Sequence, residues 1–231
     1  MTLDDLAALN AERAARRAVV LVTCLEDGTA RVVRAHAVDG DVLAADLTRA
    51  LARGTSGVVT AQGRRYFLTV RTPPARLVLI GAVHIAQHLA GMARGVGLDV
   101  TIVDPRAAFA TPERFPQERL CVEWPDRASP LIGLDRFTAL AALTHDPKID
   151  DPALAAGLAA PCFYIGALGS RKTQEQRRAR LSAQGFSARD IDRIHAPIGL
   201  PIGAVGPAEI AVAILAEIIQ TARRPPDRAP P

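Results

Sequence analysis

The sequence predicts an α/β protein in which a parallel sheet carries helices on both faces, preceded by a small α+β domain. From residue 75 onward, short apolar strand patterns alternate with helical patterns, which is typical of a parallel sheet. Before Thr72-Pro73-Pro74, hairpin turns join the strand patterns instead. A chain of 231 residues that is 49% hydrophobic and 23% charged can bury cores for both parts. We expect domains at residues 1–72 and 75–222, followed by a disordered tail at 223–231.

The first 72 residues predict two helices and two hairpins. Thr2, followed three residues later by Asp5, marks a helix start because the two side chains can form a capping box. Strands are expected at Val19–Thr23 and Val32–Val38, with a turn at Asp27-Gly28 between them. The remaining elements are a helix over 43–51 that ends at Gly54, and strands at 58–59 and 66–70 that turn at Gln62-Gly63.

The segment from Arg76 to Ala86 resembles the opening strand, tight turn and helix of a dinucleotide-binding Rossmann fold. In the fingerprint GxGxxG/A, Gly81 holds the turn position and Ala86 the third position, where a small residue permits close helix packing. Val83 stands at the second glycine position, and its isopropyl group would crowd a pyrophosphate there. Asp104 lies 23 residues after Gly81, where the acidic group that binds a ribose hydroxyl usually sits. The sequence therefore predicts the Rossmann architecture more strongly than a bound nucleotide.

The second domain continues as alternating helices and strands. After the Gly81 turn comes a helix that we expect to bury Ile85, Leu89, Met92 and Val96 and to end at Gly97. Further strands are predicted at 100–104, 120–124, 139–143 and 162–165. The last helix, from Pro207 to about Thr221, is apolar nearly all round, so we expect it to be buried, with a subunit contact as the alternative.

Polar clusters follow several of these strands. The carboxyl ends of parallel strands share one crevice, where open α/β sheets bind their ligands. His84 follows the first strand, and Thr144-His145-Asp146 follows the strand at 139–143, where it offers either an acid and a base or a cap for the next helix. In Gly169-Ser170-Arg171-Lys172, Ser170 can cap a helix whose amides and two cations would bind an oxyanion. The alternative is an ordinary capped helix with a solvated basic face.

Several other functions find little support. The three cysteines, Cys24, Cys121 and Cys162, have neither disulfide-framework nor metal spacing, which favours the reducing cytoplasm. His84 and His88 have the i, i+4 spacing of a metal pair, but no third ligand is evident, so we expect no metal site. The chain shows no signal peptide and no apolar run long enough to span a membrane. Its net charge of +4 forms no continuous basic stripe, so we expect no nucleic acid partner.

Five ordered motifs between about residues 66 and 221 resemble the XdhC/CoxI family, the maturation factors of xanthine dehydrogenase and CO dehydrogenase type molybdenum hydroxylases. The motifs are Gly81–Gln87, Asp104-Pro105-Arg106 with Arg114-Phe115-Pro116, Leu143–Asp146, Tyr164–Lys172, and His195–Leu200 with Glu209-Ile210-Ala211. The resemblance implies an accessory protein that transiently binds molybdenum cofactor, as molybdopterin or its dinucleotide form, and inserts it into an apo-hydroxylase. It also implies that a cysteine desulfurase or a second member of the family is a further partner. A homodimer is expected as well.

The resemblance gives the polar clusters a shared role. Gly169, Ser170 and Arg171 would hold the cofactor phosphate, whereas Asp104, His84, His145 and Asp146 would meet the pterin or its substituents. The expected cofactor-binding set is Gly81, Val83, His84, Asp104, Arg106, His145, Asp146, Gly169, Ser170 and Arg171. No catalytic residue is assigned.

Two other functions remain open at this point. One is an NAD(P)-dependent Rossmann oxidoreductase with His145 as the proton donor, which Asp104 supports and Val83 opposes. The other is a noncatalytic scaffold whose helical C-terminal part recruits the hydroxylase or a cysteine desulfurase. Family members commonly carry a Ser-Gly-Gly-Cys element in a longer first domain, whereas residues 1–70 here contain no Gly-Gly-Cys. Cys24 lies in a strand-like run and is expected to be a buried thiol.

Overall fold

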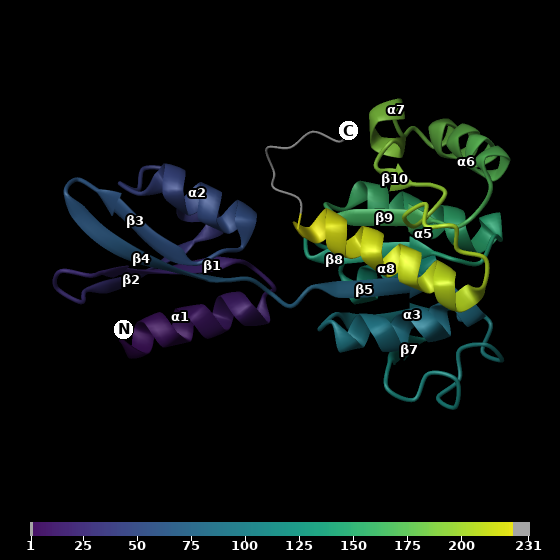
Figure 1. The fold of residues 1–231 in the computed structure, drawn as a ribbon, viewed down its shortest axis with the longest axis horizontal. Coiled ribbons are helices and arrows are strands. Elements are labelled where there is room, and N and C mark those ends of the chain that lie inside the picture. The colour runs from purple at the N-terminus through teal and green to yellow at the C-terminus, as the bar shows by residue number, and fades with distance from the viewer. Residues whose placement is uncertain (1, 224–231) are drawn as a thin grey trace. The chain divides into compact units, whose positions relative to one another are not determined.

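The computed structural model of the chain describes residues 2–223, which divide into two compact units, one ending at Pro73 and the other spanning Pro74–Arg223 (Figure 1). Each unit is described by itself. The tail predicted at 223–231 lies outside the described residues except for Arg223, which is the last residue of a helix. No helix in the described part of the chain is long and apolar enough to cross a membrane.

The described part of the N-terminal unit is a four-stranded antiparallel sheet of order β2-β1-β4-β3, with α1 and α2 on opposite faces (Figure 1). The Thr2 and Asp5 capping box begins α1 as the sequence predicts, and Gly54 ends α2 with a positive φ of 63°. Cys24 is buried, as expected. The elements are α1 Leu3–Ala14, β1 Val19–Cys24, β2 Ala30–Arg34, a 3-10 turn at Ala35–Ala37, α2 Ala44–Arg53, β3 Gly57–Ala61 and β4 Arg64–Arg71.

The prediction that the second strand reaches Val38 is wrong. In β2 the pairing stops at Arg34, which lies opposite Val19, the first residue of β1. Beyond that point the neighbouring strand offers no backbone partner, and the chain turns into the 3-10 segment.

The described C-terminal unit is a six-stranded parallel sheet of order β10-β9-β8-β5-β6-β7, which confirms the predicted Rossmann-like class. Successive residues of each strand face opposite sides and feed two cores. One core contains Leu77 and Leu79 of β5 under α3 and α8, and the other contains Val78 and Ile80 under α4 and α5. The elements are β5 Arg76–Ile80, α3 His84–Gly95, β6 Asp99–Val103, β7 Arg119–Cys121, α4 Pro125–Ile132, β8 Thr138–Ala142, α5 Pro147–Ala159, β9 Tyr164–Ala167, α6 Arg171–Ala183, α7 Ala188–Ile191, β10 Ile194–His195 and α8 Pro207–Arg223.

Strand boundaries differ from the predictions where a neighbouring strand ends. β7 stops at Cys121, opposite Val103, because β6 stops there too, so the expected strand residues 122–124 lead into α4. β9 begins two residues later than expected, at Tyr164, and leaves Cys162 outside the strand. The edge strand β10 was not predicted, since two residues give no periodic pattern.

Two helices bury less than the sequence predicts. Val96 follows the last residue of α3 and is exposed; the buried positions of that helix are Ala86, Leu89, Ala90 and Ala93. Helix α8 buries one face on α3 and the sheet but leaves Val212 and Ile219 exposed, so the expectation of burial all round is wrong.

Candidate functional site

The turn after β5 lies against the loop after β8. Gly81 has a φ of +106°, and a Cβ atom there would lie 2.5 Å from the Cγ2 atom of Thr144. Glycine is therefore required both for the backbone conformation and for the close approach. Ala86, fully buried in the first turns of α3, occupies the position where the fingerprint needs a small side chain.

Asp104, at the carboxyl end of β6, is fully buried and already hydrogen-bonded. Its Oδ2 accepts from the Ala82 amide at 2.8 Å and from Arg106 Nη2 at 2.7 Å, while its Oδ1 accepts from the Arg106 amide and Nε, both at 2.9 Å. Burial alone would raise the pKa of Asp104, but these donors hold it below its ordinary value. The carboxylate therefore fixes the β5 turn and orients the Arg106 guanidinium, and has no free oxygen edge for a ribose.

Val83 and His84 form the entrance to α3. Val83 is the N-cap residue, is half-buried against the core and supplies no side-chain hydrogen bond to the helix. His84 and His88 are exposed on the helix surface. Among residues 2–223, no group of three or more His, Cys, Asp or Glu side chains is arranged to hold a metal ion.

The loop after β8 is organised around the buried carboxylate of Asp150. The Thr144 hydroxyl donates to Asp150 Oδ1 at 2.7 Å, and the His145 amide donates to Oδ2 at 3.0 Å. His145 is held at a φ of 63° with its side chain exposed. Asp146 caps α5 by accepting from the Lys148 amide at 2.9 Å, which is the capping role that the sequence left open.

Asp150 faces a second buried charge, Arg177 of α6. Arg177 Nη2 lies 4.0 Å from Asp150 Oδ2 and donates to the Leu168 carbonyl at 3.0 Å, which ties the β8 loop to the end of β9. Among the described residues, Arg177 Nε has no hydrogen-bond partner although it is buried. Burial raises the pKa of Asp150 and lowers that of Arg177. Sequence reasoning missed this pair; two consecutive aspartates, Asp150 and Asp151, inside the otherwise apolar α5 were the available signal.

The loop after β9 contains the segment that the sequence predicts to bind an oxyanion. Ser170 caps α6, with its Oγ accepting from the Thr173 amide at 3.2 Å, as the sequence predicts. Gly169 has a φ of +138°. Arg171 and Lys172 are exposed and make no ion pair within the described part of the chain.

The structure brings most of the predicted set to one edge of the sheet. Contacts run from Asp104 through Ala82 and Gly81 to Thr144, and the loop that begins at Thr144 is joined by Asp150 and Arg177 to the loop after β9. The charge of Arg106 is close enough to Asp146 and Asp150 for those carboxylates to help raise its pKa, although its hydrogen bond to Asp104 contributes most. This edge of the sheet therefore presents side chains of both signs, with Arg106, Arg171 and Lys172 supplying positive charges.

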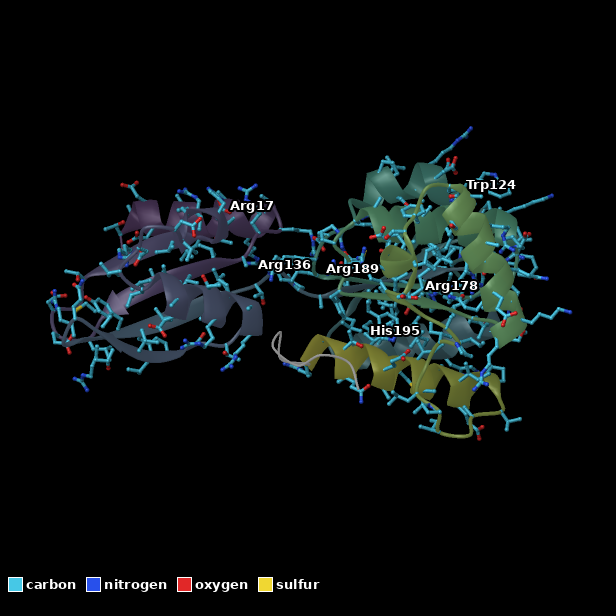
Figure 2. The ribbon with its side chains drawn as sticks, turned by 90° about the horizontal axis from the view of Figure 1, so that it is seen from above. Arg17, Trp124, Arg136, Arg178, Arg189 and His195 are labelled. Carbon is cyan, nitrogen blue, oxygen red and sulfur yellow. The ribbon has the colours of Figure 1, made fainter. Side chains whose placement is uncertain are left out.

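A separate polar cluster joins β9, β10 and α8. Glu217 of α8 accepts from the Tyr164 hydroxyl at 2.6 Å, from the Gly199 amide at 2.8 Å and bonds His195 Nδ1 at 2.9 Å. His195 lies beside α8, and its ring centroid is 4.7 Å from that of Tyr164 (Figure 2). Burial alone would raise the pKa of Glu217, but the three hydrogen bonds hold it below its ordinary value. No local pattern signals this cluster, because its acid lies 22 residues from its histidine.

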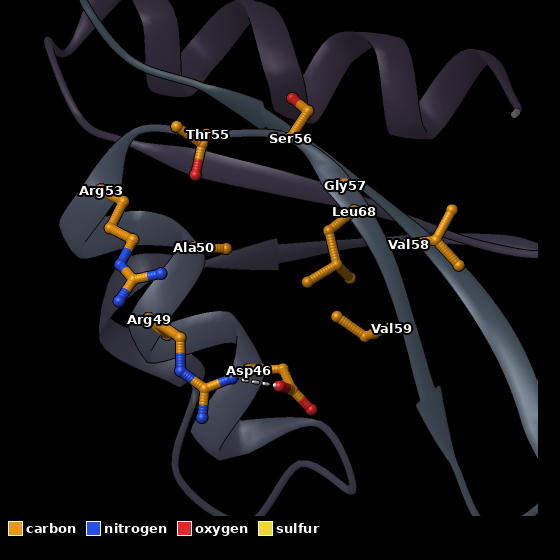
Figure 3. Close-up of a pocket in the computed structure, with 10 residues that line it drawn as sticks. All are labelled: Asp46, Arg49, Ala50, Arg53, Thr55, Ser56, Gly57, Val58, Val59 and Leu68. Atoms are coloured by element: carbon orange, nitrogen blue, oxygen red, sulfur yellow. Dashed lines mark hydrogen bonds and ion pairs between the residues drawn. The ribbon is translucent and has the colours of Figure 1, made fainter.

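The N-terminal unit contains a shallow pocket of about 220 Å³ between α2, β3 and β4 (Figure 3). Arg49, Arg53 and Asp46 rim it, and Arg49 Nη1 donates to Asp46 Oδ1 at 2.9 Å. None of the predicted site residues lines this pocket.

Comparisons with known proteins identify relatives of both the fold and the sequence. Residues 77–218 match the family model described as the XdhC Rossmann domain. A crystal structure described as a xanthine dehydrogenase from Bacillus halodurans superposes with a TM-score of 0.67 at 23% identity, over 98% of this chain and 66% of that one. At that identity the match supports the fold alone.

Three curated proteins are 32% identical to the chain. They are the uncharacterized protein YqeB of Escherichia coli (69% of this chain, 30% of that protein), a Bacillus subtilis protein named as a probable xanthine dehydrogenase subunit (71% and 48%), and the molybdenum cofactor insertion chaperone PaoD of Escherichia coli (63% and 40%). The chain spans less than half the length of each of these three relatives. Because the family match covers more than half of its 231 residues, the chain belongs to the XdhC family.

Proposed function

We propose that this chain binds molybdenum cofactor in the crevice at the carboxyl edge of its parallel sheet and delivers it to an apo-molybdenum hydroxylase. The observation that carries the proposal is the convergence of the loops after β5, β6, β8 and β9. The loop after β6 presents Arg106, and the loop after β9 presents Arg171 and the capped N-terminus of α6. The relative PaoD, named as a molybdenum cofactor insertion chaperone, supports the same role.

The residues at the crevice suit a phosphorylated pterin. A phosphate needs cations and free backbone amides, which Arg171, Lys172 and the first turn of α6 offer next to the Gly169 turn. A pterin ring needs hydrogen-bonding groups, and the exposed His84 and His145 lie at the ends of β5 and β8. The bound cofactor would contribute its molybdenum and dithiolene, while the chain would contribute binding, orientation and shielding.

A thiol contact to the cofactor is not part of this proposal. Cys24 and Cys162 are buried, and burial raises the pKa of Cys162 to about 11. Cys121, half-buried at the carboxyl end of β7, also has its pKa raised by burial. With raised pKa values, the thiols of Cys121 and Cys162 stay protonated near neutral pH and are poor ligands and nucleophiles.

The nicotinamide alternative is weaker on two counts. Val83 places a branched side chain where a pyrophosphate would approach the helix. The Asp104 carboxylate, which would bind the ribose hydroxyls of NAD, is engaged by Ala82 and Arg106. We expect the partners of the chain to be the hydroxylase and either a cysteine desulfurase or a second homologue. A scaffold that only recruits these partners would have the same fold as the carrier but would bind no pterin.

One purification tests the three possibilities together. Protein isolated without oxygen is oxidised to convert bound pterin into its fluorescent form, and a parallel sample is titrated with NADH and NADPH. We expect pterin fluorescence in proportion to protein, and its loss in the double variant His84→Ala with Arg171→Ala. The matched control replaces His88, which is exposed, and Arg178, whose side chain is 40% exposed and pairs with Asp192. They lie on the same two helices but about one and two turns further from the proposed site, so this variant should retain pterin. Protein without pterin would overturn the carrier proposal, and nucleotide binding would favour the oxidoreductase.

A further inference from the structure

The loop between β6 and β7 exposes an aromatic ring that has two arginines near it. Phe109 is 43% exposed, and the Arg106 guanidinium carbon lies 4.5 Å from its ring centroid. The guanidinium of Arg114 lies 5.9 Å from the same centroid and 5.6 Å from that of Phe115. An exposed phenylalanine alone is ordinary, but here two guanidinium groups lie within cation–π distance of one exposed ring.

Both guanidinium groups are held in place by hydrogen bonds, and Arg106 also pairs with the Asp104 carboxylate. Arg106 uses Nε and Nη2 for Asp104, so its Nη1 has no acceptor within the described residues. Arg114 Nη1 donates to the Phe109 carbonyl at 2.7 Å, and Arg114 Nη2 donates to Gln87 Oε1 on α3 at 3.1 Å. Neither guanidinium must reorder to meet a ligand, so little conformational entropy is lost on binding.

The backbone of Phe109 is hydrogen-bonded to both arginines. Its amide donates to the Arg106 carbonyl at 2.9 Å and its carbonyl accepts from Arg114. Phe115, which follows Arg114, is buried in the core beside α3 and anchors the loop. The Phe109 backbone is thus held on both sides of its side chain, and the residue remains 43% exposed with the Arg106 guanidinium over its ring.

We infer that Arg106, Phe109 and Arg114 form a clamp for a planar heterocycle that carries an anionic group. The heterocycle would stack on Phe109, and its anion would accept from Arg106 Nη1. Arg114 would hold the ring in place and add positive potential. The inference deepens the proposed function, on which it rests for the identity of the natural ligand, because both the pterin and the nucleobase of a dinucleotide cofactor have this chemistry. Free nucleotides share it, so the probes must separate these sources.

The test uses the whole chain and pterin-6-carboxylate, a fluorescent planar anion, with binding followed by fluorescence anisotropy. GDP, CDP and inorganic phosphate serve as competitors. Phe109→Leu keeps apolar bulk but removes the ring, and Phe109→Tyr restores a ring. The control is Phe137→Leu, because Phe137 also has an arginine near its ring, with Arg136 at 5.4 Å, but lies before β8 at the amino edge of the sheet.

Stacking of a base on an aromatic side chain contributes enough that its loss weakens binding by about 5- to 150-fold. We expect Phe109→Leu to weaken pterin-6-carboxylate binding within that range, while Phe109→Tyr and Phe137→Leu stay within about twofold of the unchanged protein. Competition by GDP or CDP identifies a nucleobase as a ligand, and its absence assigns the clamp to the pterin. Equal affinities in all four proteins, no binding to the unchanged chain, or competition by phosphate as strong as by GDP would each overturn the inference.

The same variants separate this inference from the proposed function. If protein purified without oxygen retains pterin and Phe109→Leu retains it equally, the clamp is wrong and the carrier proposal stands. If the unchanged protein retains no pterin but binds the probe through Phe109, the carrier proposal is wrong and the clamp stands. Unfolding of each variant, followed by the fluorescence of Trp124, checks that a loss of binding is not a loss of fold.

Discussion

The buried pair of Asp150 and Arg177 gives the sharpest stability prediction, because the next residue of α6, Arg178, forms a more exposed pair with Asp192. Arg177 is 2% exposed and lies 4.0 Å from Asp150, whereas the neighbouring Arg178 has a side chain 40% exposed and pairs with Asp192 at 2.6 Å. Arg178 is labelled in Figure 2. The variants Arg177→Met and Arg178→Met thus remove the same group from two environments.

The expected magnitudes differ several-fold. At 4.0 Å and an effective dielectric constant of about 20, the attraction within the buried pair is roughly 4 kcal/mol. The variant Arg177→Met loses this attraction and the hydrogen bond to the Leu168 carbonyl. Burial of the methionine side chain and protonation of Asp150 restore part of the lost free energy of unfolding. We expect the free energy of unfolding to fall by about 3 kcal/mol. Arg178→Met should lower it by about 1 kcal/mol or less, since exposed pairs are screened by water.

The loss should also depend on pH. The pKa of Asp150 is raised in the folded protein, chiefly by burial, so ionising this carboxyl costs stability as the pH rises from about 4 toward the folded pKa. Without Arg177 the folded pKa rises further, and the window of lost stability widens upward. The difference between Arg177→Met and the unchanged protein should therefore be larger at pH 7.5 than at pH 4.5. Asp150→Asn added to Arg177→Met should recover about half of the loss.

The assay is urea unfolding followed by tryptophan fluorescence. Trp124 is the only tryptophan of the chain and belongs to the Pro74–Arg223 unit, so its emission follows that unit without interference from the other. A difference of less than about 1 kcal/mol between the two methionine variants at pH 7.5 would refute the reasoning. So would a loss in Arg177→Met that is the same at both pH values.

Three further predictions use the same unfolding assay. Gly81→Ala should lower the free energy of unfolding by about 2–4 kcal/mol, because φ is +106° and the new Cβ would lie 2.5 Å from Thr144. Gly91→Ala in α3, where a new Cβ would meet nothing within 4 Å, should leave that free energy unchanged or raise it. Equal effects of the two substitutions would contradict the prediction. Gly166→Ala should lower the free energy of unfolding by about 1–3 kcal/mol, since the new Cβ would lie 2.6 Å from the Tyr164 hydroxyl. Burial raises the pKa of Tyr164, so in an absorbance titration this variant should also let Tyr164 ionise at a lower pH than in the unchanged protein. Glu217→Gln should lower the free energy of unfolding by about 2–3 kcal/mol at pH 7. Because the pKa of Glu217 is lowered in the folded protein, this loss of stability should become smaller as the pH falls below about 4.5. A loss that is the same at every pH would disprove the prediction.

The sequence predicts the fold well where a pattern is local and repeated. The Thr2 capping box, the Ser170 cap and the Gly81 turn each depend on residues within a few positions, and all appear where expected. The wrong strand ends at Val38 and at 122–124 have a common cause. A strand stops where its neighbour stops, and a single strand's sequence contains no information about its neighbour's length.

The charged residues inside the fold could not be predicted for a related reason. Arg177 and Arg178 are adjacent, of the same type and on the same helix, yet one is buried and the other exposed. What separates them is Asp150, 27 positions away on another helix, together with the Leu168 carbonyl. Likewise Glu217 joins Tyr164 and His195 only because α8 returns across the sheet. Long-range contacts of this kind set burial, and no window of sequence contains both partners.

Asp104 shows how one shared backbone geometry can favour a different class of ligand. In a nicotinamide-binding Rossmann domain, the carboxylate at the end of the second strand would select a neutral ribose diol by accepting its hydroxyls. Here the same position accepts from Ala82 and from two nitrogens of Arg106, so the group that faces the ligand is a guanidinium. A guanidinium selects anions, and its placement over Phe109 adds a stacking surface. Together with Val83 at the second glycine position, the engagement of Asp104 disfavours the ribose and pyrophosphate contacts of NAD. Both observations support our proposal that the ligand at this edge of the sheet is a phosphorylated pterin.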